Sequence, residues 1–303
     1  MADYPIRRAA FDWLEMQSDL HGGVLPRPLL AQGFVYEGTR IPLVAPQGIF
    51  KPASMELPLS ITTTSGGPYK DAFGPSLLQY KYRGVDPDHR DNCGLRELMH
   101  RREPLVYLHA LVQGKYLAVW PVFVVEDDRA SLTFSVAVDD ALAVRSGATV
   151  GTQADESLAA VRRYITATVK RRIHQAAFRE RVIDAYRNQC ALCRLKHQEL
   201  LDAAHIIPDS DPDGEPVVQN GIALCKIHHA AFDHFFLSIR PDYRIEIRRD
   251  VMVERDGPML KHGLQGLDGQ QIELPSQIRL RPSVRMLEQR HQKFLEFGAG
   301  GTG

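Results

Sequence analysis

The stretch Tyr186–Ile239, YRNQCALCRLKHQELLDAAHIIPDSDPDGEPVVQNGIALCKIHHAAFDHFFLSI, holds three of the four cysteines of this chain. Two pairs stand out in it, Cys190 with Cys193 and Cys225 with His228, each separated by two residues. One Cys-x-x-Cys pair alone is also typical of a redox motif. Two such pairs on tight knuckles supply the four ligands of a tetrahedral zinc site when the knuckles meet. The spacing therefore predicts a structural Zn²⁺ held by all four residues.

The same stretch contains polar residues that this zinc does not need, namely His205, Asn220, His229 and Asp233. Asp233 follows His229 by four residues, so both lie on one face of a helix and can hold one cation. A neutral histidine can take a proton from water near pH 7, and Mg²⁺ or Mn²⁺ can stabilise charge on a phosphate. These residue types predict phosphodiester hydrolysis with His205 as the general base. Taken alone, His205 also fits a structural histidine.

The segments DAAHIIP, NGIALC and HHAAFD resemble the HNH (ββα-metal) nuclease family. The resemblance implies a strand that carries His205 as the base, a loop Asn220 that supports it, and a helix whose His229 binds the catalytic cation. Many members of the family have a metal ligand directly before the base, and this position is Ala204 here. Asp202 lies on the same face of the strand as Ala204. We expect Asp202 to replace the missing ligand or to orient His205.

Composition limits the class of protein. The chain has 303 residues, enough for two domains, and 44% of them are hydrophobic, which supports real cores. Its formal net charge is zero, so it lacks the overall basic signature of a nucleic-acid binder, although a local basic patch suffices for binding. We find no apolar run long enough for a membrane span and no apolar signal core at the N-terminus. Cysteines gathered in a metal-like cluster indicate a reducing compartment, and we expect a cytoplasmic protein.

The N-terminal half is expected to be rich in strands. Residues 9–20 predict a short amphipathic helix. From Phe34 to Ala137, short apolar runs alternate with Gly, Pro and Asp turns, with one helical piece at 94–101. This pattern predicts a barrel or a strongly curved sheet.

Within residues 42–126, the segments SGGPYKDAFG, LLQYKYRG and GKYLAVWPVFV resemble, in this order, the SRA family. SRA domains are PUA-like barrels that read methylated cytosine by flipping it out of DNA. A flipped base needs aromatic faces to replace its stacking partners and an acceptor for the cytosine amine. The candidates are Tyr69 and Tyr82 for the faces and Asp71 for the acceptor. Without the resemblance, both tyrosines fit packing roles and Asp71 fits a turn. A proline interrupts the Gly-Gly-Tyr of the family, and Gly-Lys-Tyr stands where the family has Tyr-Asp-Gly.

Residues 157–185 predict a basic helix. We expect five of its side chains to contact DNA phosphates, although a solvated helix face fits the same pattern: Arg162, Arg163, Lys170, Arg171 and Arg172. After the central stretch, the sequence predicts a hairpin with its turn at Pro241-Asp242 and a terminal helix at 283–297.

Together these observations predict an α+β protein with an SRA-like β-barrel domain at 1–145, a basic helical linker at 146–185, and a zinc-stabilised HNH domain at 186–303. The expected function is that of a modification-dependent restriction endonuclease acting on double-stranded DNA with 5-methylcytosine or a derivative. One HNH site cuts one strand, so duplex cleavage predicts a homodimer or the paired action of two chains. Two alternatives remain: a non-cutting, zinc-stabilised DNA-binding protein, and an HNH nuclease whose N-terminal domain reads sequence or protein.

Overall fold

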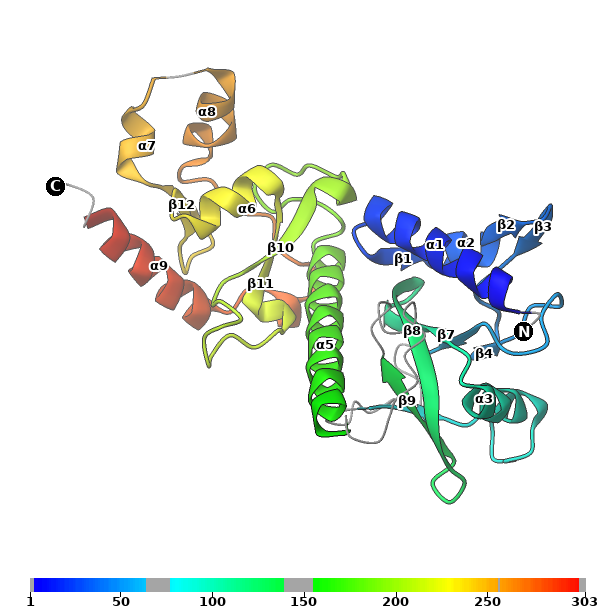
Figure 1. Cartoon of the computed structure of the whole chain (residues 1–303). Helices are drawn as coiled ribbons and strands as arrows, with labels where there is room; N and C mark the ends of the chain where they lie inside the picture. The colour runs from blue at the N-terminus through cyan, green and yellow to red at the C-terminus, as the bar shows by residue number, and fades with distance from the viewer. Residues whose placement is uncertain (1–2, 64–76, 139–154, 256, 300–303) are drawn as a thin grey trace. The chain divides into compact units, whose positions relative to one another are not determined.

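The computed structural model describes residues 3–63, 77–138, 155–255 and 257–299, and the side chains of 155–163 and 299 are outside this description (Figure 1). The chain forms two compact units, Met1–Ala176 and Ala177–Gly303. Helix α5 (Asp155–Ala185) contains the boundary between them. The division at 145 and 185 that the sequence suggests stays a prediction.

The N-terminal unit is built on one curled, seven-stranded sheet. The strand order is β4-β5-β7-β8-β9-β6, with β1 paired to β8, and only β5 and β7 run parallel. Its strands are β1 (Val24–Pro26), β4 (Ile49–Phe50), β5 (Ser60–Thr62), β6 (Leu78–Lys81), β7 (Leu105–Val112), β8 (Lys115–Asp128) and β9 (Thr133–Val138). The strongly curved sheet that the sequence predicts is confirmed. Among the described strands, β4 and β6 lie at the two edges of the sheet and do not pair with each other, so a closed barrel is not observed.

Besides the first part of α5, the described residues of this unit form three helices and a small hairpin. They are α1 (Tyr4–Leu20), α2 (Arg27–Gln32), α3 (Arg90–Arg101) and the hairpin β2 (Phe34–Tyr36) with β3 (Thr39–Ile41). Both helices expected here are confirmed, and each begins earlier than its apolar pattern does. The extra first turn of α1 contains Arg7, which is buried and donates from Nη1 to the carbonyls of Pro58 (2.8 Å) and Pro104 (3.0 Å). This arginine fastens α1 to the loops before β5 and β7, so a polar contact extends the helix beyond its apolar stripe.

The C-terminal unit contains the strand–strand–helix arrangement predicted by the central stretch. Strands β10 (Leu201–His205) and β11 (Gly221–Cys225) pair antiparallel, and α6 (Lys226–Asp233) starts directly after β11. The remaining elements are η1 (Gln198–Leu200), η2 (Val218–Asn220), β12 (Leu237–Ile239), β13 (Ile245–Ile247), α7 (Arg249–Val253), α8 (Pro258–Gly263), η3 (Gln265–Leu267), η4 (Ile278–Leu280) and α9 (Val284–Ala299). The predicted hairpin is β12–β13 and the predicted terminal helix is α9, so both are confirmed.

One apolar core joins the elements of this unit. It includes Phe178 and Val182 from the end of α5, Ile222 and Leu224 from β11, and Leu287 from α9. The residues of β11 are all buried, which explains why this strand reads as a continuous apolar run. Among the described residues no helix is long and apolar enough to cross a membrane.

Candidate active site

The hairpin β10–β11 and helix α6 bring the chemically active residues of the central stretch together. His205 is the last residue of β10 and pairs with Gly221, the first residue of β11. At the other end of the hairpin Leu201 pairs with Cys225, and α6 follows at once with His228, His229 and Asp233. Residues that are twenty or more positions apart in sequence thereby share one small frame.

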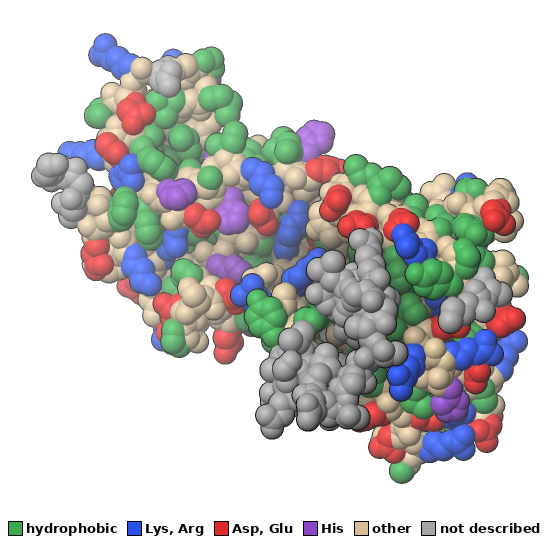
Figure 2. Space-filling view, viewed as in Figure 1, with side chains coloured by type: hydrophobic (Ala, Val, Ile, Leu, Met, Phe, Trp, Pro, Cys, Tyr) green, Lys and Arg blue, Asp and Glu red, His purple; other side chains and the backbone are tan. Residues whose placement is uncertain are grey.

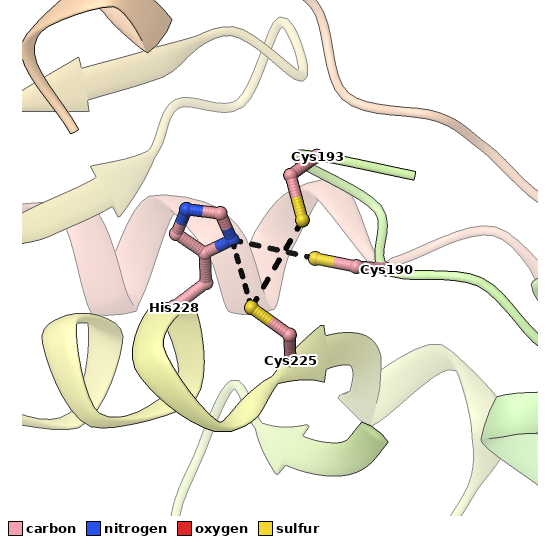
Figure 3. Close-up of side chains that lie close together, drawn as sticks. All are labelled: Cys190, Cys193, Cys225 and His228. Carbon is pink, nitrogen blue, oxygen red and sulfur yellow. Dashed lines mark hydrogen bonds between the residues drawn. The ribbon is translucent and has the colours of Figure 1, made fainter. Parts of the chain in front are cut away.

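Cys190, Cys193, Cys225 and His228 form a cluster whose ligand atoms all lie within 4.8 Å of one another. Figure 3 shows the three sulfurs and the imidazole turned toward a common centre. The Nδ1 atom of His228 is 3.3 Å from the Sγ of Cys225 and 3.5 Å from that of Cys190, while Cys193 and Cys225 have their sulfurs 4.0 Å apart. A tetrahedral zinc with bonds of ordinary length separates such ligand atoms by about 3.5–3.8 Å. The cluster therefore has the donor set and the spacing of a tetrahedral metal site.

The surroundings of the cluster fix its ligands. The Nε2–H of His228 donates to the carbonyl of Gly263 at 2.7 Å, which leaves Nδ1 with its lone pair toward the sulfurs. The knuckle at Cys190 is closed by two backbone bonds, from Cys190 N to Leu195 O (2.9 Å) and from Arg194 N to Cys190 O (3.0 Å). Gly263 belongs to α8, so the cluster ties α6 to a segment thirty-five residues further along the chain.

His205 occupies a half-buried position in which one ring face is covered. Its imidazole stacks on the ring of Phe178, with centroids 4.0 Å apart and an angle of 17° between the planes. The Nε2 atom is buried and has no hydrogen-bond partner among the described residues. Burial lowers the pKa of His205 below its ordinary value, and the nearby Asp209 offsets this effect only in part. The ring is therefore held neutral near pH 7, which is the protonation state that a general base needs.

Asn220 is completely buried and holds the loop that follows β10. Its Oδ1 accepts from the amide of Ile207 (2.8 Å), and its Nδ2 donates to the carbonyls of Ile207 and Glu215, both at 3.0 Å. The amide of Ile206 also donates to the Asn220 carbonyl at 2.9 Å. The residue fixes the backbone just after His205 instead of touching the imidazole. A supporting function for Asn220 therefore acts through the backbone.

His229 lies between two carboxylates. Its Nδ1 is 3.4 Å from the Oδ2 of Asp202, and its Nε2 is 3.3 Å from the Oδ2 of Asp233. The hydrogen bond with Asp202 raises the pKa of His229 against the effect of burial. Burial alone favours a higher pKa for Asp202, but its bonds with His229 and Lys226 outweigh this and hold that pKa well below the ordinary value. The two carboxylates thus contact different nitrogens of one imidazole. Among the described residues, only Cys190, Cys193, Cys225 and His228 form a group of three or more such side chains with ligand atoms close enough together to hold a metal ion.

Asp202 has other partners that separate it from His205. Lys226 Nζ is 3.2 Å from its Oδ2 and Arg179 Nε is 3.5 Å from its Oδ1. No hydrogen bond or ion pair joins Asp202 to His205 in the described part of the chain. Of the two functions expected for Asp202, contact with His229 fits the geometry and orientation of His205 does not. Figure 2 shows histidine side chains surrounded by acidic and basic ones on the visible face of the C-terminal unit.

Arg179 is a site residue that the sequence reading missed. The basic sequence 157–185 predicts that arginines of this helix contact DNA, whereas Arg179 contacts the β10–β11 hairpin. It donates from Nη2 to the carbonyl of Leu201 (2.8 Å) and from Nη1 to the buried Glu180 (2.6 Å). The sequence gives only a weak indication of this contact, because Arg179 differs from the other arginines of the helix only in being followed by a glutamate, Glu180.

Tyr82, expected to provide one face of a base pocket, lies in the core of the N-terminal unit. Its side chain is 3% exposed, its ring stacks on Phe134 at 4.6 Å, and its hydroxyl is bonded to Asp127. Arg96 completes this network, with its Nε 2.6 Å from Asp127. The Tyr82 side chain is therefore packed between an apolar partner, the Phe134 ring, and a polar partner, the Asp127 carboxylate. This placement fits the packing role that the sequence also allows, and a base-stacking role for Tyr82 stays a prediction.

The other residues expected to contact DNA are placed only in part. Tyr69 and Asp71 lie outside the described residues, as do the side chains of Arg162 and Arg163. Lys170, Arg171 and Arg172 are all exposed on α5. Their exposure is compatible with phosphate contact and equally with a solvated helix face.

The segment that forms this site matches a known protein family. Residues 190–240 match the model of a family described as HNH endonuclease (HNH_2). This segment is an HNH endonuclease domain. It begins at the first cysteine of the metal cluster and contains both strands and the helix of the HNH frame.

No curated protein matches the chain. Among solved structures, one described as "Modification dependent TagI restriction endonuclease" aligns with a TM-score of 0.29 and 16% identity, covering 78% of this chain and 81% of that chain.

Proposed function

We propose that this chain is a modification-dependent restriction endonuclease whose HNH domain hydrolyses DNA phosphodiesters. One observation carries the nuclease part: His205 ends β10 with a buried, unpartnered Nε2, in the same ββα frame as the His229 group. A structural histidine at this degree of burial is expected to have both ring nitrogens satisfied. The half-buried imidazole of His205, neutral near pH 7, accepts the proton of the attacking water in this proposal.

In this proposal the base, the ligands of the catalytic cation and the ligands of the structural zinc are different residues. His205, neutral near pH 7, takes the proton from water, and Asn220 keeps the backbone after β10 in the place that this requires. His229, Asp233 and Asp202 hold a divalent cation, Mg²⁺ or Mn²⁺, which when bound stabilises charge on the phosphate and the leaving oxygen. Cys190, Cys193, Cys225 and His228 hold a structural Zn²⁺ that anchors α6, the helix carrying two of the cation ligands.

The N-terminal unit is proposed to read the modified base, 5-methylcytosine or a derivative, in double-stranded DNA. Tyr69 and Asp71 are the remaining candidates for the pocket, on the strength of the SRA resemblance of their segment. The exposed Lys170, Arg171 and Arg172, with Arg162 and Arg163, are proposed to contact phosphates along α5. Because one HNH site cuts one strand, the active form is proposed to be a homodimer.

Digestion of matched duplexes tests this function. Four DNAs of one sequence, unmodified, methylated, hydroxymethylated and glucosylated at cytosine, are incubated with the protein and Mg²⁺ or Mn²⁺. Cleavage confined to one or more modified DNAs is the expected result. Cleavage of all four at similar rates leaves the nuclease but removes the dependence on modification. No cleavage of any DNA, with binding intact, favours the non-cutting protein.

The burial of Tyr82 favours a second candidate, an HNH nuclease whose N-terminal unit reads DNA sequence or a protein. With that ring in the core, the base pocket has lost one of its three expected residues. The digestion described above separates the two candidates directly.

A further inference from the structure

Phe178 covers one face of His205 although it lies outside the segment 190–240 that matches the HNH family model. We propose that Phe178 is a positioning residue of the nuclease reaction, fixing the plane of the His205 imidazole that takes the proton from the attacking water. The proposal rests on the assignment of His205 as the base. It adds a residue from helix α5 to a site otherwise built by the hairpin and α6.

The geometry limits what the imidazole can do. The rings of Phe178 and His205 are nearly parallel, 17° apart, and their centroids lie 4.0 Å from each other, which is the separation of two aromatic rings in contact. Phe178 itself is 2% exposed and belongs to the core of the unit, so it does not move aside at low cost. A histidine held by such a wall retains little freedom about its second torsion. The plane of the imidazole is therefore fixed before DNA binds.

Gly221, the residue paired with His205 across the hairpin, makes room for this wall. A Cβ atom at Gly221 would lie 2.4 Å from Cγ2 of Val182 and 2.8 Å from Cζ of Phe178. Both distances are shorter than any real contact of that kind, and both neighbours are buried side chains of α5. The backbone of Gly221 has φ −129°, which any residue adopts, so the glycine is needed for space and not for its conformational freedom.

A second contact keeps Phe178 in register with the hairpin. Arg179, the next residue of α5, donates from Nη2 to the carbonyls of Leu201 (2.8 Å) and Gln198 (3.3 Å). The same guanidinium reaches the Asp202 carboxylate through Nε at 3.5 Å. Two consecutive residues of α5 thus hold the two ends of β10, Phe178 at His205 and Arg179 at Leu201. The last turns of α5 therefore hold β10, the strand that carries His205, at both of its ends.

The test replaces the ring while keeping an apolar side chain, with Phe178→Leu and Phe178→Met. Phe294→Leu and Phe294→Met are the matched controls, because Phe294 is a buried phenylalanine of the same unit whose ring stacks on His291 and not on His205. Cleavage of the best modified duplex is measured as kcat and KM, and zinc content and thermal unfolding show that each variant is folded. In parallel, the ring protons of His205 are followed by NMR in the full chain without DNA, with His205→Gln giving the assignment.

We expect the Phe178 variants to lower kcat by about ten- to a hundred-fold with little change in KM, as for a misplaced catalytic group. The Phe294 variants are expected to keep the wild-type kcat. The His205 ring protons should lie upfield in the wild type and move downfield in the Phe178 variants, because the ring current of the stacked phenylalanine is lost. A wild-type kcat in folded Phe178→Leu, or an equal loss in Phe294→Leu, overturns the proposal.

Unchanged His205 shifts in the Phe178 variants also overturn it, whether or not the protein cuts DNA. If the wild type cleaves none of the DNAs, the proposed nuclease function fails while the NMR comparison still decides whether Phe178 positions the ring. The two failures are therefore distinguishable.

Discussion

The Nδ1 atom of His229 lies 3.4 Å from the Oδ2 of Asp202, three residues before the proposed base. Ala204 stands where many members of the HNH family have a metal ligand, and we propose that Asp202 takes the place of that ligand. Alternate residues share one face of a strand, so Asp202 reaches forward to the helix from the face on which Ala204 is buried. Asp202 and Asp233 thereby contact the two different ring nitrogens of His229.

Replacing Asp202 by Asn should weaken the divalent cation without unfolding the domain. The amide keeps the shape but removes the charge that holds His229 and offsets Lys226. We expect the Mn²⁺ concentration for half-maximal cleavage to rise about 10- to 100-fold, as when a residue around a metal site is changed. The measurement is a cation titration of cleavage at one DNA concentration. Asp242→Asn, an exposed aspartate of the β12–β13 turn, is the control, and an equal response in both variants would contradict the assignment.

The acid side of the pH profile should depend on the cation concentration. His205 has a pKa below the ordinary 6.5 and acts when neutral, so at saturating cation the rate falls only as the pH drops through that lowered pKa. His229 has a raised pKa, and its proton competes with the cation. At limiting cation the fall should therefore begin at a higher pH. Profiles recorded at two Mn²⁺ concentrations check this, and identical acid limbs would show that His229 does not hold the cation.

Removal of the structural metal should unfold the C-terminal unit. Cys225→Ser takes one ligand from a cluster that joins α6 to the Cys190 knuckle and, through His228, to α8. Binding of zinc to such sites contributes about 10–16 kcal/mol, most of which appears as folding free energy. We expect about one zinc per purified wild-type chain and loss of both zinc and the cooperative unfolding transition in the variant. Cys93→Ser, an exposed cysteine outside the cluster, should change neither.

Tyr82→Ala should destabilise the N-terminal unit instead of removing base selectivity. Truncating a buried aromatic ring costs about 3–5 kcal/mol, and here the Asp127–Arg96 network also loses a partner. Binding to modified and unmodified duplexes should therefore fall together. Asp71→Ala, by comparison, should lower binding to the modified duplex alone by about ten-fold, a free-energy change of about 1.4 kcal/mol. Paired titrations at one salt concentration and a melting curve of each variant separate these cases.

Most of the nuclease site could be predicted from the sequence because its residues lie in one short, ordered segment. The spacing of Cys190, Cys193, Cys225 and His228 is itself a geometric constraint, and His229 with Asp233 follows from the helix repeat. Phe178 and Arg179 could not be found this way. Their contacts with His205 and Asp202 depend on how α5 packs against the β10–β11 hairpin. The sequence does not show which phenylalanine or arginine of a basic helix lies at that contact.

The N-terminal unit was less predictable. Apolar runs in β7 and β8 indicate buried strands, but the order β4-β5-β7-β8-β9-β6 depends on pairings between residues far apart in sequence. Tyr82 illustrates the limit for single residues. A tyrosine in strand-rich sequence fits a pocket wall or a core position equally well, and only the ring of Phe134 and the carboxylate of Asp127 decide for the core.

In the proposed reaction, this chain cuts DNA with His205 as the general base. The most direct test compares single-turnover cleavage of one modified duplex by the wild type and by His205→Ala, at equal protein, zinc content and Mg²⁺. A positioned general base contributes about 10²–10⁴-fold, so we predict a rate loss of that size with DNA binding unchanged. Cleavage by folded His205→Ala at a rate close to the wild type would contradict the account.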